Sequence, residues 1–225
     1  MAKSRRNKEV RLTAVKKHSK EKKNKLVESI RSAIESPENG KDCFVYLLAL
    51  SNQRNSPLKN LRIILKPGRV FYGKNKVMQL ALGQKPESEL VTNIHKIAER
   101  ISGERALLVS SETPDVVKGK LEGYKVADFS KSGNVAVDTV ILKPDDEILK
   151  SFPGNMEPQL RQLGLPTILN LGKIKLLSEF IVCEKGKPLT PNQAQILKLI
   201  GIRMSLFEVN VAAYWHDGTF FDVKG

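Results

Sequence analysis

The most constraining feature of this 225-residue sequence is an uninterrupted apolar run at residues 44–50. The run has the length of a β-strand, and none of its side chains is charged. A strand of this composition is typically covered on both faces, so other elements must form layers on each side of it. Hydrophobic residues make up 40% of the chain, which is enough to build such a core.

Helix-like and strand-like patterns alternate downstream of this run. The expected elements are a helix beginning at Ser56-Pro57, a strand at residues 70–72, a helix at residues 74–82, a longer helix from Pro86 to about Gly103 and a strand at residues 106–109. The order strand, helix, strand, helix, helix, strand predicts a three-layer-like α/β domain with a mostly parallel central sheet.

The pattern changes after Ser110. Residues 111–183 contain short helical and extended segments separated by Gly and Pro, which predicts a small inserted α/β domain. After this segment, Thr190-Pro191 begins another helix, and a strand at residues 206–214 turns at Asp217-Gly218 into a final strand.

These last elements are expected to supply the missing edge of the first domain. The predicted parts of the chain are a basic N-terminal arm at residues 1–25, a discontinuous α/β domain at residues 26–110 and 184–225, and the inserted domain at residues 111–183.

The positive charge is concentrated at the N-terminus. Residues 1–25 contain eleven Lys or Arg against two Glu, so they supply +9 of the chain's net charge of +14. A basic arm of this kind indicates an anionic partner such as a nucleic acid. The run Lys3-Ser4-Arg5-Arg6-Asn7-Lys8 also suits nuclear import.

Two polar loops follow predicted strands. Ser51-Asn52-Gln53-Arg54-Asn55-Ser56 leads into Lys59, and Gly73-Lys74-Asn75-Lys76 leads into the next helix. A loop at a helix N-terminus suits a phosphate, although ordinary turn chemistry explains the first loop equally well. In a parallel sheet both loops would lie at the carboxyl edge, where such folds bind ligands.

The sequence offers no constellation typical of catalysis or metal binding. The three histidines are scattered, and His95 is expected to be a solvated helix residue. Cys43 and Cys183 lie in apolar runs and are expected to be reduced. Trp215 could stack on a base, but packing at a strand end is the more usual role. We therefore expect no enzyme, no cofactor, no metal and no membrane-spanning segment.

Three stretches resemble a known family. They are Gly73-Lys74-Asn75-Lys76-Val77-Met78, the segment at residues 156–167 and the basic opening at residues 3–8. They are similar to the mRNA turnover protein four family of nucleolar ribosome assembly factors. That family is related to the ribosomal stalk-base protein, which is called L-ten in bacteria and acidic P-zero in eukaryotes. The resemblance extends over nearly the whole chain.

The resemblance implies an RNA-binding α/β domain with an insertion. It also implies binding to the stalk-base (GTPase-associated) region of large-subunit rRNA in nuclear pre-ribosomes, beside the L-eleven-type ribosomal protein, at the site that P-zero later takes. The expected location is the nucleolus, with possible shuttling to the cytoplasm. The RNA-binding residues expected from the loops, the arm and this resemblance are Lys3, Arg5, Arg6, Lys22, Lys23, Arg54, Asn55, Ser56, Lys59, Lys74, Asn75 and Lys76.

Two other functions stay open. A mature structural ribosomal protein of the stalk base is the alternative. Against it, the chain ends at Gly225, where P-zero continues into helices that carry acidic stalk proteins, so we expect no binding of those proteins. A nuclease is the third possibility, and no acid–base or metal constellation supports it.

Overall fold

The computed structural model describes residues 18–36, 43–144 and 146–223. The chain folds into two compact units, and each is discontinuous in sequence. The first unit comprises the described residues of Met1–Ala49, Arg62–Lys120 and Asn210–Gly225, and the second comprises those of Leu50–Leu61 and Leu121–Val209. Strand β9 (Ser205–His216) is continuous through the boundary between them.

The first unit is built on a sheet in which the apolar run forms an inner strand. The order is β10 (Thr219–Asp222), β9, β1 (Phe44–Ser51), β3 (Arg105–Ser110) and β2 (Arg69–Phe71). The C-terminal strands β9 and β10 thus extend the sheet beyond β1. They form a hairpin whose turn residues, Asp217 and Gly218, both have positive φ.

The prediction of a mostly parallel sheet is wrong. β1 and β2 each pair antiparallel with β3, and β9 and β10 also pair antiparallel. The helices between the strands explain these directions, because each helix reverses the course of the chain. One helix, α2 (Asn55–Ile64), separates β1 from β2, which run in the same direction. Two helices separate β2 from β3, which therefore returns in the opposite direction.

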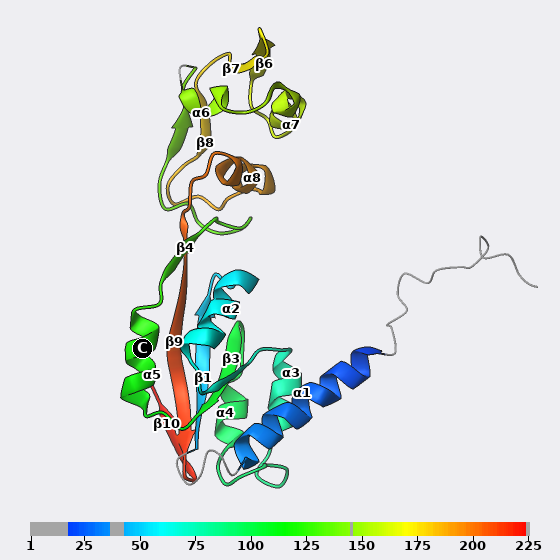
Figure 1. Ribbon diagram of the computed structural model, residues 1–225, viewed down its shortest axis with the longest axis vertical. Coiled ribbons are helices and arrows are strands. Elements are labelled where there is room, and N and C mark those ends of the chain that lie inside the picture. Colours follow the sequence, from blue (N-terminus) through cyan, green and yellow to red (C-terminus); the bar gives the residue numbers. More distant parts are fainter. Residues whose placement is uncertain (1–17, 37–42, 145, 224–225) are drawn as a thin grey trace, which may run out of the picture. The chain divides into compact units, whose positions relative to one another are not determined.

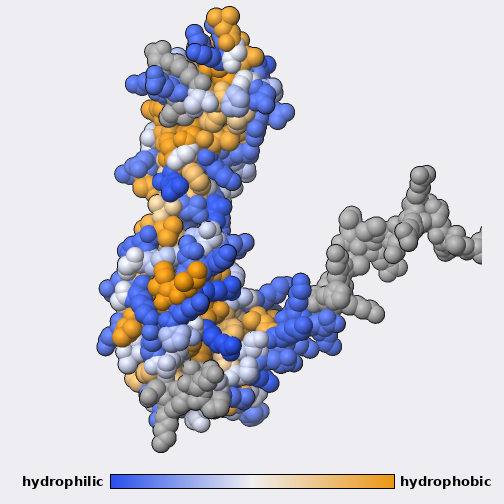
Figure 2. All heavy atoms as spheres, in the orientation of Figure 1, coloured by the Kyte–Doolittle hydropathy of each residue, from blue (hydrophilic) through white to orange (hydrophobic). Residues whose placement is uncertain are grey.

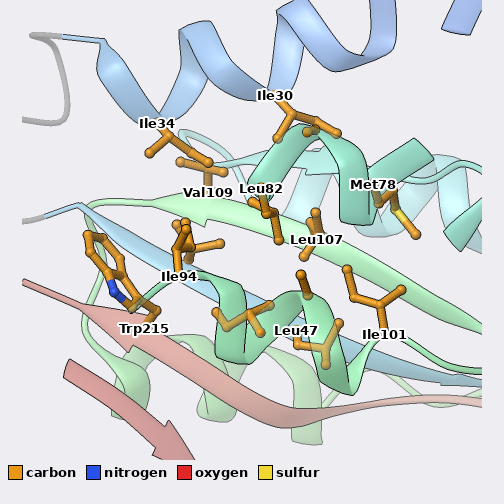
Figure 3. Packing of buried hydrophobic residues seen from close by; sticks show 14 of the residues in the cluster. Ile30, Ile34, Leu47, Met78, Leu82, Ile94, Ile101, Leu107, Val109 and Trp215 are labelled. Atoms are coloured by element: carbon orange, nitrogen blue, oxygen red, sulfur yellow. The ribbon is translucent and has the colours of Figure 1, made fainter. Parts of the chain in front are cut away.

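Alternate residues of the inner strands face a core covered by three helices. These helices are α1 (His18–Glu35), α3 (Asn75–Leu82) and α4 (His95–Arg100). Figure 3 shows Ile30 of α1 and Met78 of α3 above Leu47 and Leu107 of the sheet, and Trp215 packs at the edge of the same cluster. Helix α5 (Pro114–Glu122) lies on the opposite face (Figure 1).

The predicted helix from Pro86 to Gly103 is shorter than expected. The chain turns sharply after α3, and the Leu90 N–H donates to the Leu82 carbonyl oxygen at 3.1 Å. Gly83 permits this turn, since its φ is 96° and an added Cβ would lie 2.3 Å from the Ser88 carbonyl oxygen. Only His95–Arg100 are α-helical in this segment.

The second unit contains short elements around a separate apolar core. Besides β4 (Val126–Asp128) they are β5 (Val140–Leu142), α6 (Glu147–Lys150), the 3-10 turn η3 (Gly154–Met156), α7 (Glu157–Gln162), β6 (Thr167–Asn170), β7 (Lys173–Leu176), β8 (Phe180–Cys183) and α8 (Pro191–Leu199). Leu160, Ile174, Val182 and Ile196 are buried in this core. β4 pairs with the first part of β9.

Thr190 caps α8 as predicted. Its hydroxyl accepts from the Gln193 N–H, while the Gln193 side chain accepts from the Thr190 N–H. The two residues form a capping box, which satisfies donors that a helix start would otherwise leave unpaired.

Both cysteines are free thiols. Cys183 is buried and Cys43 is half-buried, and burial raises the pKa of each thiol above its ordinary value. Within the described ranges, no helix is long and apolar enough to cross a membrane. The same residues contain no group of three or more His, Cys, Asp or Glu side chains that could hold a metal ion.

Candidate nucleic-acid interface

Helix α1 has one apolar side and one strongly basic end. Ile30, Ala33 and Ile34 are buried in the core of the first unit, whereas Lys22 and Lys23 in the N-terminal half are exposed. Figure 2 shows hydrophilic surface along this helix. The sequence analysis named Lys22 and Lys23 but not Lys20 and Lys25, which are also exposed there. The density of lysine in this stretch was the signal that could have found them.

A glycine lets α1 approach the loop that follows β2. An added Cβ at Gly73 would lie 2.4 Å from Cδ2 of Leu26, so the leucine occupies the space that a larger residue would need. Lys22 and Lys23 precede Leu26 by four and three positions and therefore share its side of the helix. The basic end of α1 is in this way directed toward the Gly73 loop.

The loop itself contributes two exposed lysines. Lys74 precedes the first turn of α3 with extended backbone, and no side chain caps the helix there. Lys76 lies in that first turn, and both lysines are exposed. The N-terminal N–H groups of a helix add a partial positive charge to these two full charges. The arrangement suits a phosphate.

Asn75 and Gln79 hold this loop in place. The Asn75 amide donates to the Gly103 carbonyl oxygen at 2.9 Å, and the Gln79 amide donates to the carbonyl oxygens of Ala98 and Ile101 at 3.1 Å each. Asn75 is half-buried, and its amide nitrogen is used within the fold.

Arg31 fastens α1 to α3 at the opposite end. Its guanidinium donates to the carbonyl oxygens of Ala81 and Leu80, at 3.2 and 3.3 Å. These carbonyls belong to the last turn of α3 and would otherwise face solvent unpaired. α1 is thus held against α3 by the Leu26 contact at one end and by Arg31 at the other. We name the exposed lysines that this packing gathers, Lys22, Lys23, Lys74 and Lys76, the four-lysine surface.

The other predicted loop belongs to the second unit, and its arginine is engaged internally. Arg54 donates to the Phe129 carbonyl oxygen at 2.7 Å, and its Nε lies 3.5 Å from a carboxylate oxygen of Asp128. The Arg203 guanidinium stacks over the Phe129 ring at 5.5 Å. The Arg54 side chain is only 34% exposed, and Asp128 offsets its charge.

Neighbouring residues tie the same loop to two more segments. Asn52, in the left-handed region at φ 54°, donates to the Leu206 carbonyl oxygen, and the Lys131 ammonium donates to the Gln53 carbonyl oxygen. Asn55, Ser56 and Lys59 are exposed at the start of α2. Ser56 lies inside the helix, which begins at Asn55 and not after Ser56.

The structure does not bring all the predicted residues into one site. Lys22, Lys23, Lys74, Asn75 and Lys76 lie in the first unit, whereas Arg54, Asn55, Ser56 and Lys59 lie in the second. Lys3, Arg5 and Arg6 lie outside the described residues.

His95 differs from its prediction as a solvated side chain. It is half-buried, and its Nδ1 lies 2.6 Å from Oε2 of Glu89. This hydrogen bond holds the pKa of Glu89 below its ordinary value. The pair fastens the turn before α4.

Comparisons with known proteins identify the family. The family model described as "Ribosomal protein L10" matches residues 18–125, and a second model, which describes the insertion domain of this protein in the 60S subunit, matches residues 130–202. The large ribosomal subunit protein uL10 of Thermococcus sibiricus is 27% identical over 73% of this chain and 48% of its own length.

Assembly factors are more similar and match almost end to end. The ribosome assembly factor Mrt4 of Dictyostelium discoideum is 36% identical, over 98% of this chain and 96% of that protein. Mrt4 of Saccharomyces cerevisiae is 30% identical over 96% and 94% of the two chains. The resemblance found in the sequence is confirmed. The chain therefore belongs to the Mrt4 family of ribosome assembly factors, which is related to ribosomal protein L10.

Proposed function

We propose that this chain is a ribosome assembly factor that binds large-subunit rRNA at the stalk base in nuclear pre-ribosomes. It holds the site that the stalk protein P-zero later takes. The observation that carries the proposal is the four-lysine surface, in which the Gly73–Leu26 contact directs a basic helix end toward two basic loop residues. Phosphate groups are the natural ligands of such a surface.

The family supports the choice of RNA. The most similar relatives are named ribosome assembly factors, and more distant ones are named large ribosomal subunit proteins. A chain related to both is expected to recognise ribosomal RNA. Phosphate contacts by lysine fix position and orientation, while the RNA fold supplies the specificity.

The other parts of the proposal concern location and partners. The N-terminal arm, with Lys3, Arg5 and Arg6, adds phosphate contacts and directs the chain to the nucleus and nucleolus. In the pre-ribosomal particle, the L-eleven-type protein is the proposed neighbour. We expect no catalytic activity. The prediction that acidic stalk proteins do not bind stays to be tested by mixing them with the purified chain.

A mature structural protein of the stalk base is the second candidate. The similarity to uL10 proteins favours it. The two functions differ in where the chain is found. An assembly factor sediments with nuclear precursor particles, whereas a structural protein sediments with translating polysomes.

Binding to an isolated stalk-base rRNA fragment tests the proposal. We expect the unchanged chain to bind this fragment, and the double variant Lys74→Glu/Lys76→Glu to lose binding because two attractions to phosphate become repulsions. Both side chains are exposed, so the fold should be retained with a small change in stability.

A second charge reversal controls for net charge. Lys85 and Lys96 are exposed in the same unit but outside the four-lysine surface. The Lys85→Glu/Lys96→Glu variant changes the net charge equally and should retain most of the affinity. Normal binding by a folded Lys74→Glu/Lys76→Glu variant would place the RNA elsewhere, and equal losses in both variants would reduce the interaction to unspecific attraction.

A further inference from the structure

The hairpin of β6 and β7 in the second unit has an unusual turn. The strands pair antiparallel, with Thr167 opposite Leu176 and Asn170 opposite Lys173. The turn between them consists of Leu171 and Gly172, and both have positive φ, 48° and 76°. Turns of this kind favour Asn or Gly at the first position, because a larger side chain crowds its own backbone.

Leu171 gains no compensating contact for this conformation within the fold. Its side chain is 97% exposed, the most among the large hydrophobic residues in the described part of the chain. A leucine in the left-handed region that is also fully solvated is unfavourable twice over. Such an outlier indicates that the side chain serves a contact outside the fold.

Further exposed residues on the hairpin extend this feature. Ile168 lies opposite Lys175, so both project from the face directed away from the core. Leu177 follows on that face and is 67% exposed, and Lys173 and Lys175 are exposed too. Figures 1 and 2 show the hairpin at an extremity of its unit, with hydrophobic surface at the end. We name Ile168, Leu171, Lys173, Lys175 and Leu177 the hairpin surface.

The fold holds this hairpin firmly. Ile174 and Leu176 on its other face are buried in the core of the second unit. Gly154 of η3 lies so close that an added Cβ would be 3.0 Å from Cδ1 of Leu169 and 3.1 Å from the Gly172 carbonyl oxygen. A turn supported from below presents Leu171 in a fixed position, which lowers the entropy lost on binding.

We propose that the hairpin surface docks on a protein partner, whose apolar pocket receives Leu171 and whose carboxylates at the pocket rim pair with Lys173 and Lys175. The mixture of apolar and basic side chains selects this chemistry by charge complementarity. Aliphatic side chains offer no stacking surface to a base, which favours protein over RNA. This inference does not depend on rRNA binding by the four-lysine surface.

Site-specific photo-crosslinking tests the proposal. A benzophenone amino acid replaces Asn170, which is exposed beside the tip, in the full chain expressed in cells. We expect one polypeptide to be crosslinked. Leu171→Asn should abolish that crosslink while leaving the thermal stability equal or higher, because Asn accepts positive φ more readily. Leu171→Gly gives a second variant that fits the same backbone.

Charge variants separate the docking surface from general basicity. Lys173→Glu/Lys175→Glu should abolish the crosslink, whereas Lys185→Glu/Lys198→Glu, which reverses two exposed lysines of the same unit, should retain it. The captured polypeptide, once purified, should bind the Leu171→Asn chain at least about tenfold more weakly than the unchanged chain.

Binding to the stalk-base rRNA fragment is measured in parallel and should not change in Leu171→Asn, so loss of the crosslink cannot be mistaken for loss of RNA binding. Crosslinks to RNA at position 170 would overturn the proposal in favour of a nucleic-acid contact. Absence of any crosslink would also overturn it. So would a protein crosslink that persists in Leu171→Asn and Leu171→Gly.

Discussion

At the scale of single residues, side chains of similar chemistry have different uses. Lys74 and Lys76 are exposed and add charge to the surface, whereas Arg54 donates to Phe129 and pairs with Asp128. Asn75, between the two lysines, is tied to Gly103. A charge reversal at Lys74 or Lys76 therefore acts on binding, but a substitution at Arg54 or Asn75 also loosens the fold.

Gly73 supports a prediction about the four-lysine surface. In Gly73→Ala, the new Cβ would displace the end of the Leu26 side chain and with it the basic end of α1. Because Leu26 is half-buried and can shift, we expect a loss of stability of only about 1 kcal/mol. Affinity for the stalk-base rRNA fragment should fall by roughly threefold to tenfold, as measured by filter binding.

The double variant Gly73→Ala/Leu26→Ala makes this prediction specific. Removing the leucine side chain leaves room for the new methyl group, so part of the lost affinity should return. If the double variant binds more weakly than Gly73→Ala alone, the effect does not arise from the clash with Leu26.

The sequence was sufficient for the residues whose roles are set locally. The lysines at the start of α3 follow a strand and a glycine, and this pattern alone predicts their exposure. The engagement of Arg54 could not be predicted, because Asp128 and Phe129 are more than seventy residues away in the chain. No periodicity or spacing records such a contact.

At the scale of elements, local signals predicted what local interactions fix. The Thr190 capping box and the turn at Asp217-Gly218 involve residues within a few positions of each other. The end of the helix after Pro86 depends instead on the backfolding of Leu90 onto Leu82. The strand directions depend on the number of intervening helices. Two helices between β2 and β3 were predicted, but their effect on direction was not drawn from them.

The N-terminal arm is the element with the clearest expected contribution. Deletion of residues 1–12, which lie outside the described residues, removes several positive charges. We expect weaker binding to the stalk-base fragment without its loss, since the four-lysine surface remains. P-zero should then displace the truncated chain more easily than the full chain in a competition titration.

Two outcomes would contradict this expectation in different ways. A complex holding both proteins on a single fragment would exclude a shared site. Equal displacement of the full and truncated chains would leave the shared site intact and remove only the role given to the arm.

At the scale of the whole molecule, the charge predicts how binding responds to salt. Neutralising phosphates releases condensed counterions, so the affinity falls as salt concentration rises. If about six phosphates are contacted, a plot of log affinity against log salt should have a slope near −5. The Lys74→Glu/Lys76→Glu variant, if residual binding is measurable, should show a shallower slope. A flat response of the unchanged chain would mean that the lysines are merely solvated.

The course of β9 has a consequence for synthesis of the chain on the ribosome. β1 pairs with β3 on one side and with β9 on the other, yet β3 ends at Ser110 and β9 begins only at Ser205. At cellular elongation rates, the intervening segment takes on the order of ten seconds to be made. During that interval the nascent chain has its most apolar strand complete but one edge unpaired. An open apolar edge is where chains associate wrongly, so this protein is expected to require chaperone cover until its C-terminal hairpin emerges.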